Sequence, residues 1–170
     1  RIDESGQDVL IEPDATLYEL LSSGRDVVKE KIRHLVIEPS MECDLNCSIC
    51  FTSGQEENVS LEEISREVAK YKNKVISISG GEPTLRRDLE DIIKIVAKEN
   101  IPLLATHGLK LTDYDYLERL KKAGLRHVTF SLNGLSETSL IKTNGRPLLK
   151  EKLQALHNLI KADMEFLLSM

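Results

Sequence analysis

The chain has 170 residues, 41% of them hydrophobic and 30% charged, which is enough for one globular domain with a core and short for two. A formal net charge of −5 and an aromatic content of 4% argue against a nucleic-acid partner, which needs clustered basic residues and rings for base stacking. The apolar runs extend over about five residues at most, so no membrane span is expected.

Residues 1–33 do not follow the pattern of the rest of the chain and are interpreted as an N-terminal lead-in. They contain two predicted helices, near Thr16–Ser22 and Val27–Arg33. The first residue is Arg and there is no basic segment followed by an apolar one, so we expect a piece of a longer protein without a secretion signal.

From residue 34 onward, short apolar runs alternate with amphipathic helical patterns. The predicted strands are His34–Glu38, which Pro39 closes, then Val75–Ser79, Pro102–Thr106, Val128–Leu132 and Glu165–Leu168. The predicted helices carry apolar stripes at Leu61/Ile64/Val68/Tyr71, Leu89/Ile92/Ile93/Val96, Tyr114/Leu117/Leu120 and Leu149/Leu153/Leu156/Ile160. A capping box at Ser60 and Glu63 begins the first helix, and Gly124 ends the third.

Strands that alternate with helices in this way form βαβ units and a parallel sheet. Five strands are too few for a closed eight-stranded barrel. The sequence therefore predicts an α/β fold over residues 34–170, a partial (βα) barrel with parallel strands that is truncated after about five strands.

All three cysteines lie directly after the first predicted strand, at Cys43, Cys47 and Cys50, with the spacing C-x3-C-x2-C. Such a cluster is a poor disulfide framework and a good metal site, so a reducing cytoplasm is the expected location. Three thiolates on a short loop suit a [4Fe–4S] cluster with one open iron. Structural zinc is the alternative, but it normally needs four ligands, and folding would have to bring His34 or His107 near.

The second predicted strand is followed by Gly80, Gly81, Glu82 and Pro83. Ligands in α/β sheets bind at the carboxyl ends of strands, and two glycines there permit close approach of the backbone to a ligand. The Glu82 carboxylate is suited to accept hydrogen bonds from an ammonium group, and Pro83 to stiffen the exit. By itself, however, the segment is best interpreted as a plain turn with a solvent-exposed Glu82.

Together, the cysteine spacing, the Gly-Gly-Glu-Pro segment and the repeated βα units resemble the radical SAM superfamily. The resemblance covers about residues 34–170. It implies that Cys43, Cys47 and Cys50 ligate a [4Fe–4S] cluster whose fourth iron chelates the amino and carboxylate groups of S-adenosylmethionine (SAM). It also implies that the backbone of residues 80–83 binds the SAM amino group.

Two later strand ends also resemble the family. Thr106-His107-Gly108 stands where Thr-Asn-Gly is usual, and Ser131-Leu132-Asn133-Gly134 where Ser-Leu-Asp-Gly is common. Thr106, Ser131 and Asn133 are therefore expected to contact SAM. His107 is interpreted as a satisfied loop histidine rather than a catalytic one.

Near the cysteines the sequence departs from the family, because Ile49 stands where an aromatic residue usually packs near the adenine. Cys50-Phe51 and the segment 145–150 (GRPLLK) are similar to a branch that contains pterin methyltransferases and archaeal lipid-coupling enzymes. The family's partial barrel usually has more strands than these five, so the core is expected to be incomplete at its C-terminus.

The resemblance implies the following chemistry. An external donor of the flavodoxin or ferredoxin type reduces the cluster, SAM is cleaved to methionine and a 5′-deoxyadenosyl radical, and the radical abstracts hydrogen from an unknown small-molecule, lipid or peptide substrate. The branch suggests a methylation or a C–C bond-forming reaction. The alternative from another class is a non-catalytic Fe–S or zinc-binding module that acts as an electron relay or sensor.

Overall fold

The computed structural model describes residues 33–50 and 58–169, which form one parallel sheet and the helices that cover it. Its strands, paired in chain order, are β1 (His34–Ser40), β2 (Val75–Gly80), β3 (Ile101–Thr106), β4 (His127–Ser131) and β5 (Glu165–Ser169). The two helices predicted in the N-terminal lead-in lie outside the described residues, apart from Arg33.

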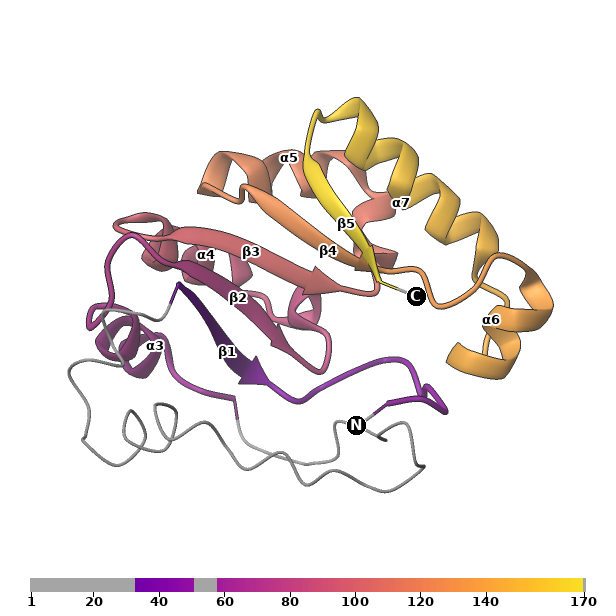
Figure 1. The fold of residues 1–170 in the computed structure, drawn as a ribbon, viewed down its shortest axis with the longest axis horizontal. Helices are drawn as coiled ribbons and strands as arrows, with labels where there is room; N and C mark the ends of the chain where they lie inside the picture. Colours follow the sequence, from indigo (N-terminus) through magenta and orange to yellow (C-terminus); the bar gives the residue numbers. More distant parts are fainter. Residues whose placement is uncertain (1–32, 51–57, 170) are drawn as a thin grey trace, which may run out of the picture. The chain divides into compact units, whose positions relative to one another are not determined.

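The connections between the strands are helical. The helices are α3 (Leu61–Val68), α4 (Leu89–Ala97), α5 (Tyr114–Ala123), α6 (Glu137–Asn144) and α7 (Leu149–Lys161), with short 3-10 turns η1 (Pro83–Leu85) and η2 (Leu109–Thr112). Parallel crossovers are right-handed, and each new strand adds to the same edge, so the helices share one face of the sheet. α4 packs between α3 and α5 behind the strands (Figure 1). The predicted α/β architecture with five parallel strands is confirmed.

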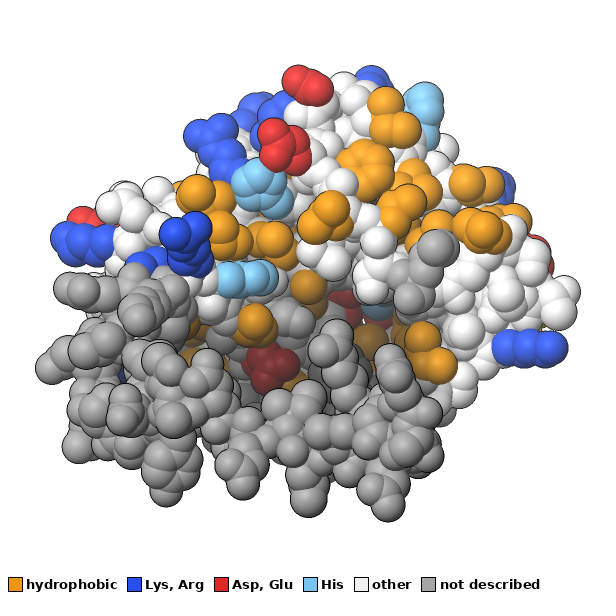
Figure 2. Space-filling view, viewed as in Figure 1, with side chains coloured by type: hydrophobic (Ala, Val, Ile, Leu, Met, Phe, Trp, Pro, Cys, Tyr) orange, Lys and Arg blue, Asp and Glu red, His pale blue; other side chains and the backbone are white. Residues whose placement is uncertain are grey.

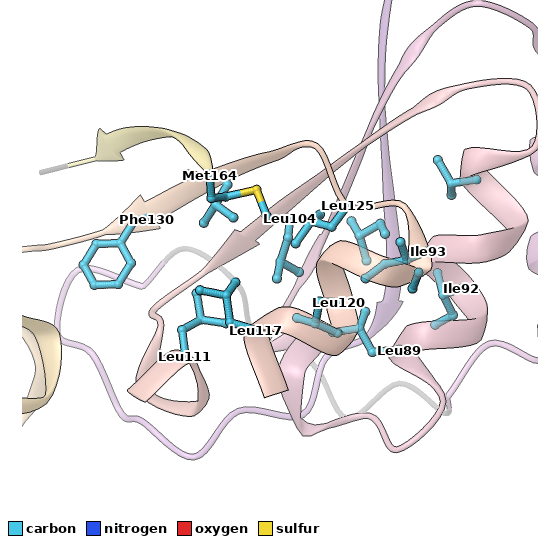
Figure 3. Close-up of a cluster of buried hydrophobic side chains, with 14 of the residues drawn as sticks. Leu89, Ile92, Ile93, Leu104, Leu111, Leu117, Leu120, Leu125, Phe130 and Met164 are labelled. Carbon is cyan, nitrogen blue, oxygen red and sulfur yellow. The ribbon is translucent and has the colours of Figure 1, made fainter. Parts of the chain in front are cut away.

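Apolar side chains of the strands and helices meet between the two layers (Figure 3). The strands contribute Ile76, Ile78, Leu104, Val128 and Phe130, and the helices contribute Leu89, Ile92, Ile93, Leu117 and Leu120, all fully or almost fully buried. The stripes predicted for α4 and α5 supply this core. The predicted ends are confirmed too, since Ser60 and Glu63 form a capping box and Gly124 ends α5 with φ +113°.

The first strand does not end where the sequence suggested, because β1 continues through Pro39 to Ser40. The pairing with β2 shifts between Ile37 and Ser40. Proline has no N–H to donate to the ladder, so it produces an irregularity here rather than the end of the strand. β1 lies at one edge of the described sheet, which is where proline is tolerated.

The stripe predicted for the last helix is wrong in part. Leu153 and Ile160 of α7 are 55% and 67% exposed, whereas Lys152, Ala155 and Leu159 are buried. Figure 2 shows hydrophobic side chains gathered over β5 and α7. β5 is the last strand of the described sheet, so no further described strand covers them.

One helix was not predicted from the sequence at all. α6 has a single buried apolar residue, Leu140, and its capping box pairs Ser136 with Ser139 instead of the usual Glu or Gln. α6 lies beyond the carboxyl ends of the strands, next to the start of α7 (Figure 1). Of the described helices, none combines the length and the apolar character that a bilayer crossing requires.

Candidate cofactor site

A cavity of about 300 Å³ opens where the carboxyl ends of the strands meet the cysteine loop. Nine of the ten predicted site residues line it, namely Cys43, Cys47, Cys50, Gly80, Gly81, Glu82, Thr106, Ser131 and Asn133. Pro83, the tenth, is buried at the start of η1 instead of lying on the cavity wall. The sequence thus identified residues that folding brings together, although their individual roles stay predictions.

The start of the cysteine loop is bonded to the Gly-Gly-Glu segment. The amide of Gly81 donates to the carbonyl of Ser40 at 3.0 Å, and the amide of Glu82 donates to the carbonyl of Glu42 at 2.7 Å. A Cβ on Gly80 would lie 2.2 Å from the Ser40 oxygen, and one on Gly81 would lie 2.3 Å from the Glu42 oxygen. The close approach that these glycines permit is therefore to the chain's own backbone, not only to a ligand as the sequence suggested.

The far side of the loop rests on the last turn of α6. The amide of Ser48 donates to the Thr143 carbonyl at 2.9 Å, and its hydroxyl donates to the Lys142 carbonyl at 2.8 Å. The side-chain nitrogen of Asn144 lies 3.0 Å from the Cys47 sulfur. The cysteine loop is thus held between the β1–β2 edge of the sheet and α6.

Cys43 lies close to the carboxylates of Glu82 and Asp44 and to the Cys47 thiol. Burial raises the pKa of the Cys43 thiol, and Glu82, Asp44 and Cys47 raise it further by repulsion between like charges. A cationic group among these side chains would relieve that repulsion. Three thiol ligands on one cavity, with no fourth cysteine in the chain, fit a cluster that keeps one open metal position.

Glu82 is not the solvent-exposed carboxylate that a plain turn would give. It is 1% exposed, and its Oε1 accepts hydrogen bonds from the Thr84 amide at 3.1 Å and from the Thr84 and Thr106 hydroxyls at 2.6 Å each. Its Oε2 accepts from the His107 amide at 2.8 Å. Glu82 therefore holds the end of β3 against the start of η1, and its oxygens have little capacity left for an ammonium group.

The hydroxyl of Thr106 is similarly engaged. It donates to Glu82 and accepts from the amide of Gly108 at 2.9 Å. One lone pair of that oxygen is left for a ligand.

His107 joins the end of β3 to the cysteine loop. Its Nε2 lies 2.8 Å from an Asp44 carboxylate oxygen, and its Nδ1 accepts from the amide of Leu109 at 3.2 Å. Because Nδ1 accepts, the proton sits on Nε2 and is donated to Asp44. The ring is buried and bonded at both nitrogens, as a satisfied loop histidine requires, and Asp44 is its partner on the cysteine loop.

The structure also offers one specific group of ligands for the zinc alternative. The Cys43 sulfur, an Asp44 oxygen and a His107 nitrogen lie within 4.8 Å of one another. This trio leaves out Cys47 and Cys50, so it can be separated experimentally from a cluster on the three cysteines.

A buried lysine that the sequence did not single out lies against the ends of two strands. Nζ of Lys152, on α7, donates to the carbonyl oxygens of Ser131 at 2.5 Å and His107 at 3.2 Å, and lies 5.4 Å from the Phe130 ring centroid. Burial lowers its pKa to about 8, while the charges of Cys47 and Glu82 act in the opposite direction. In the sequence, the only sign that Lys152 is buried is that it shares a helix face with Ala155 and Leu159. The more obvious apolar stripe on the adjacent face of α7 hides that sign.

The remaining part of the cavity wall comes from the end of β4 and from Ile49 of the cysteine loop. Asn133 has φ +59°, and its carbonyl accepts from the Thr143 hydroxyl at 3.0 Å. Ile49 lines the cavity and is half-exposed, while Phe51 lies outside the described residues.

Comparison with known proteins gives one consistent family. The model of the radical SAM superfamily matches residues 37–170. The chain is 34% identical over 140 residues to a 7,8-dihydro-6-hydroxymethylpterin dimethyltransferase of Methanocaldococcus jannaschii, covering 76% of this chain and 28% of that protein. It is 33% identical over 137 residues to a probable GTP 3′,8-cyclase of Pyrococcus abyssi, covering 76% and 44%. The chain thus spans less than half the length of either relative.

Two solved structures share the fold. Methylornithine synthase has a TM-score of 0.61 at 16% identity, over 93% of this chain and 51% of that one. A maturase of the [FeFe]-hydrogenase has a TM-score of 0.63 at 18% identity, over 94% and 40%. With the matched family model and the relatives above, these findings show that the chain belongs to the radical SAM superfamily, whose members use a [4Fe–4S] cluster and SAM.

Proposed function

We propose that residues 34–170 form the cofactor-binding core of a radical SAM enzyme that cleaves SAM reductively. A [4Fe–4S] cluster is held by Cys43, Cys47 and Cys50, and SAM binds beside it along the ends of β2, β3 and β4. The observation that carries this proposal is the single cavity lined both by the three cysteines and by the strand-end residues. The family match supports it independently.

When bound, the cluster and SAM supply the hard chemistry, which is an electron transfer that breaks a C–S bond and yields a 5′-deoxyadenosyl radical for hydrogen abstraction. The protein's share is binding and orientation. The backbone of Gly80 and Gly81 is the part of the Gly-Gly-Glu-Pro segment that we assign to the SAM amino group. Glu82 supports that backbone from behind, since its carboxylate bonds to Thr84, Thr106 and His107.

The contacts to the rest of SAM come from the ends of β3 and β4. We assign them to Thr106, Ser131 and Asn133, which share the cavity with the cysteines. Asn133 is held by the bond from Thr143 to its carbonyl, and Thr106 offers its remaining lone pair. Ile49 offers apolar contact where the family usually has an aromatic ring.

The class of substrate is proposed from the branch of the superfamily that this chain resembles. The identity of 34% to a pterin dimethyltransferase supports the branch that the sequence suggested, and with it a methylation or a C–C bond-forming reaction. We propose a small-molecule, lipid or peptide substrate, an external donor of the flavodoxin or ferredoxin type, and a reducing cytoplasm as the location. The net charge of −5 remains the argument against a nucleic-acid partner.

The test is metal analysis and SAM cleavage on the anaerobically reconstituted chain. We expect a brown protein with about four irons per chain and, with dithionite and SAM, release of 5′-deoxyadenosine. Cys43→Ala, Cys47→Ala and Cys50→Ala should each lose the iron, whereas His34→Ala on β1 should keep it.

The same variants decide the alternative. If one zinc binds at Cys43, Asp44 and His107, then Cys43→Ala and His107→Ala lose metal while Cys47→Ala and Cys50→Ala retain it. That pattern, or an iron cluster with no 5′-deoxyadenosine, would contradict the proposed function and favour a relay or sensor.

A further inference from the structure

The last turn of α6 provides a side chain that meets one of the three cysteines directly. Asn144 is 1% exposed, and its Nδ2 lies 3.0 Å from Sγ of Cys47, ninety-seven residues away in the chain. Neither the cysteine spacing nor the strand-end segments indicate this contact. It arises because α6 lies beyond the carboxyl ends of the strands, where the cysteine loop also runs (Figure 1).

The orientation of the Asn144 amide follows from hydrogen-bond chemistry. A thiolate that ligates a metal has no proton to donate, so the amide must turn its N–H, and not its oxygen, toward Cys47. The amide oxygen then lies 3.4 Å from the Thr143 hydroxyl, whose single proton has a nearer acceptor in the Ser139 carbonyl at 3.0 Å. The Thr143 hydroxyl also lies 3.0 Å from the Asn133 carbonyl, which links this turn to the end of β4.

The backbone around Asn144 keeps it in place. Ser48, the residue after Cys47, is bonded through its amide and its hydroxyl to the last carbonyls of α6. Gly145 then ends the helix with φ +75°. Because the Asn144 side chain is buried, little water competes with the sulfur for its N–H groups.

We propose that Asn144 tunes the reduction potential of the cluster by donating an N–H···S hydrogen bond to Cys47. The inference rests on the proposed cluster site. A donor at a cysteine sulfur withdraws negative charge, and one-electron reduction of the cluster adds negative charge. The bond is therefore stronger in the reduced state, which makes the cluster easier to reduce.

The test compares midpoint potentials of reconstituted protein by redox titration followed by electron paramagnetic resonance. Asn144→Leu keeps the approximate shape of the side chain and removes the donor. We expect the equilibrium constant for one-electron reduction to fall roughly tenfold, which corresponds to about 59 mV toward lower potential. Asn144→Asp has the size of asparagine and replaces the donor with a negative charge, so it should lower the potential further.

Ser48→Ala is the matched control, because it removes a hydroxyl bond from the same contact between loop and helix, while the Ser48 amide bond to Thr143 still holds the turn and the contact of Asn144 with sulfur is untouched. Its midpoint potential should equal that of the wild type. Unchanged potentials in Asn144→Leu and Asn144→Asp would overturn the inference, and so would a lower iron content in which the remaining clusters titrate as in the wild type. A wild type that assembles no cluster would instead refute the proposed function itself.

Discussion

Replacing Glu82 with Gln tests whether this carboxylate is the internal support that the hydrogen bonds indicate. Its two oxygens accept four bonds, three at Oε1 and one from the His107 amide at Oε2. Glutamine has one oxygen and one NH₂ group, so in either orientation an N–H must face an amide donor. The better orientation sacrifices the bond from the His107 amide, and it also turns the NH₂ group toward Nε2 of His107, which lies 3.3 Å from Oε2.

The cost can be estimated from these contacts. One hydrogen bond to a charged group, about 1.5–3 kcal/mol, is lost, and two N–H groups meet at the former 2.8 Å contact. The three bonds to Oε1 persist but lose the assistance of the charge. After allowance for the desolvation that a neutral side chain avoids, we expect Glu82→Gln to lower the free energy of unfolding by roughly 2–4 kcal/mol.

The assay is urea unfolding of the metal-free protein followed by circular dichroism. Glu90→Gln on α4 is the control, because Glu90 forms an exposed pair with Arg119 at 3.0 Å and such pairs contribute little, at most about 1 kcal/mol. A Glu82→Gln protein as stable as the Glu90→Gln control would refute the role as an internal support. The carboxylate would then be available to SAM, as the sequence alone suggested.

Two further substitutions address the backbone contact and the buried lysine. Gly81→Ala places a Cβ 2.3 Å from the Glu42 oxygen, so we expect a several-fold loss of iron after reconstitution. The control is Gly124→Ala, a strained site at the end of α5, which should lower the melting temperature and keep the iron. Equal iron contents in the two variants would contradict this expectation. For Lys152→Met, the stability difference from the wild type should change with pH. Between about pH 8 and 10.5 the folded state has released the Lys152 proton and the unfolded state still holds it, so wild-type stability should rise relative to the variant by up to about 1.4 kcal/mol per pH unit. Urea unfolding of the metal-free proteins at pH 7.5 and 9.5 measures this, and a constant difference would argue that Lys152 keeps its ordinary pKa.

The sequence predicts the sheet well because its strands are buried on a regular pattern. Runs such as VISIS and VTFSL have a β-branched or aromatic residue at alternate positions, and β2 and β4 bury Ile76, Ile78, Val128 and Phe130 from them. Parallel strands place their carboxyl ends at one edge, so the residues that follow them can be expected to meet. The same argument predicted that the cysteines and the strand-end residues lie close together, and they line one cavity.

The residues that the sequence did not reveal are polar side chains whose partners are distant in the chain. Asn144 and Lys152 are buried by contacts with a sulfur and with two strand-end carbonyls, and no periodicity encodes such contacts. The apolar stripe of α7 misled for the same reason, since the helix turns Lys152 inward and leaves Leu153 exposed. Glu82 was visible as a motif residue, but its burial depends on Thr106 and His107 of the next strand.

Glu82 and Lys152 solve one problem with opposite charges. Beyond the last paired residues of a parallel sheet, backbone groups lose their ladder partners and would otherwise need water. Glu82 takes the amide of His107, and Lys152 takes the carbonyls of His107 and Ser131, so the ends of β3 and β4 are satisfied by protein alone. Each charge costs desolvation, and each is partly compensated by the other. The edge of the cavity is therefore held in place by bonds within the protein.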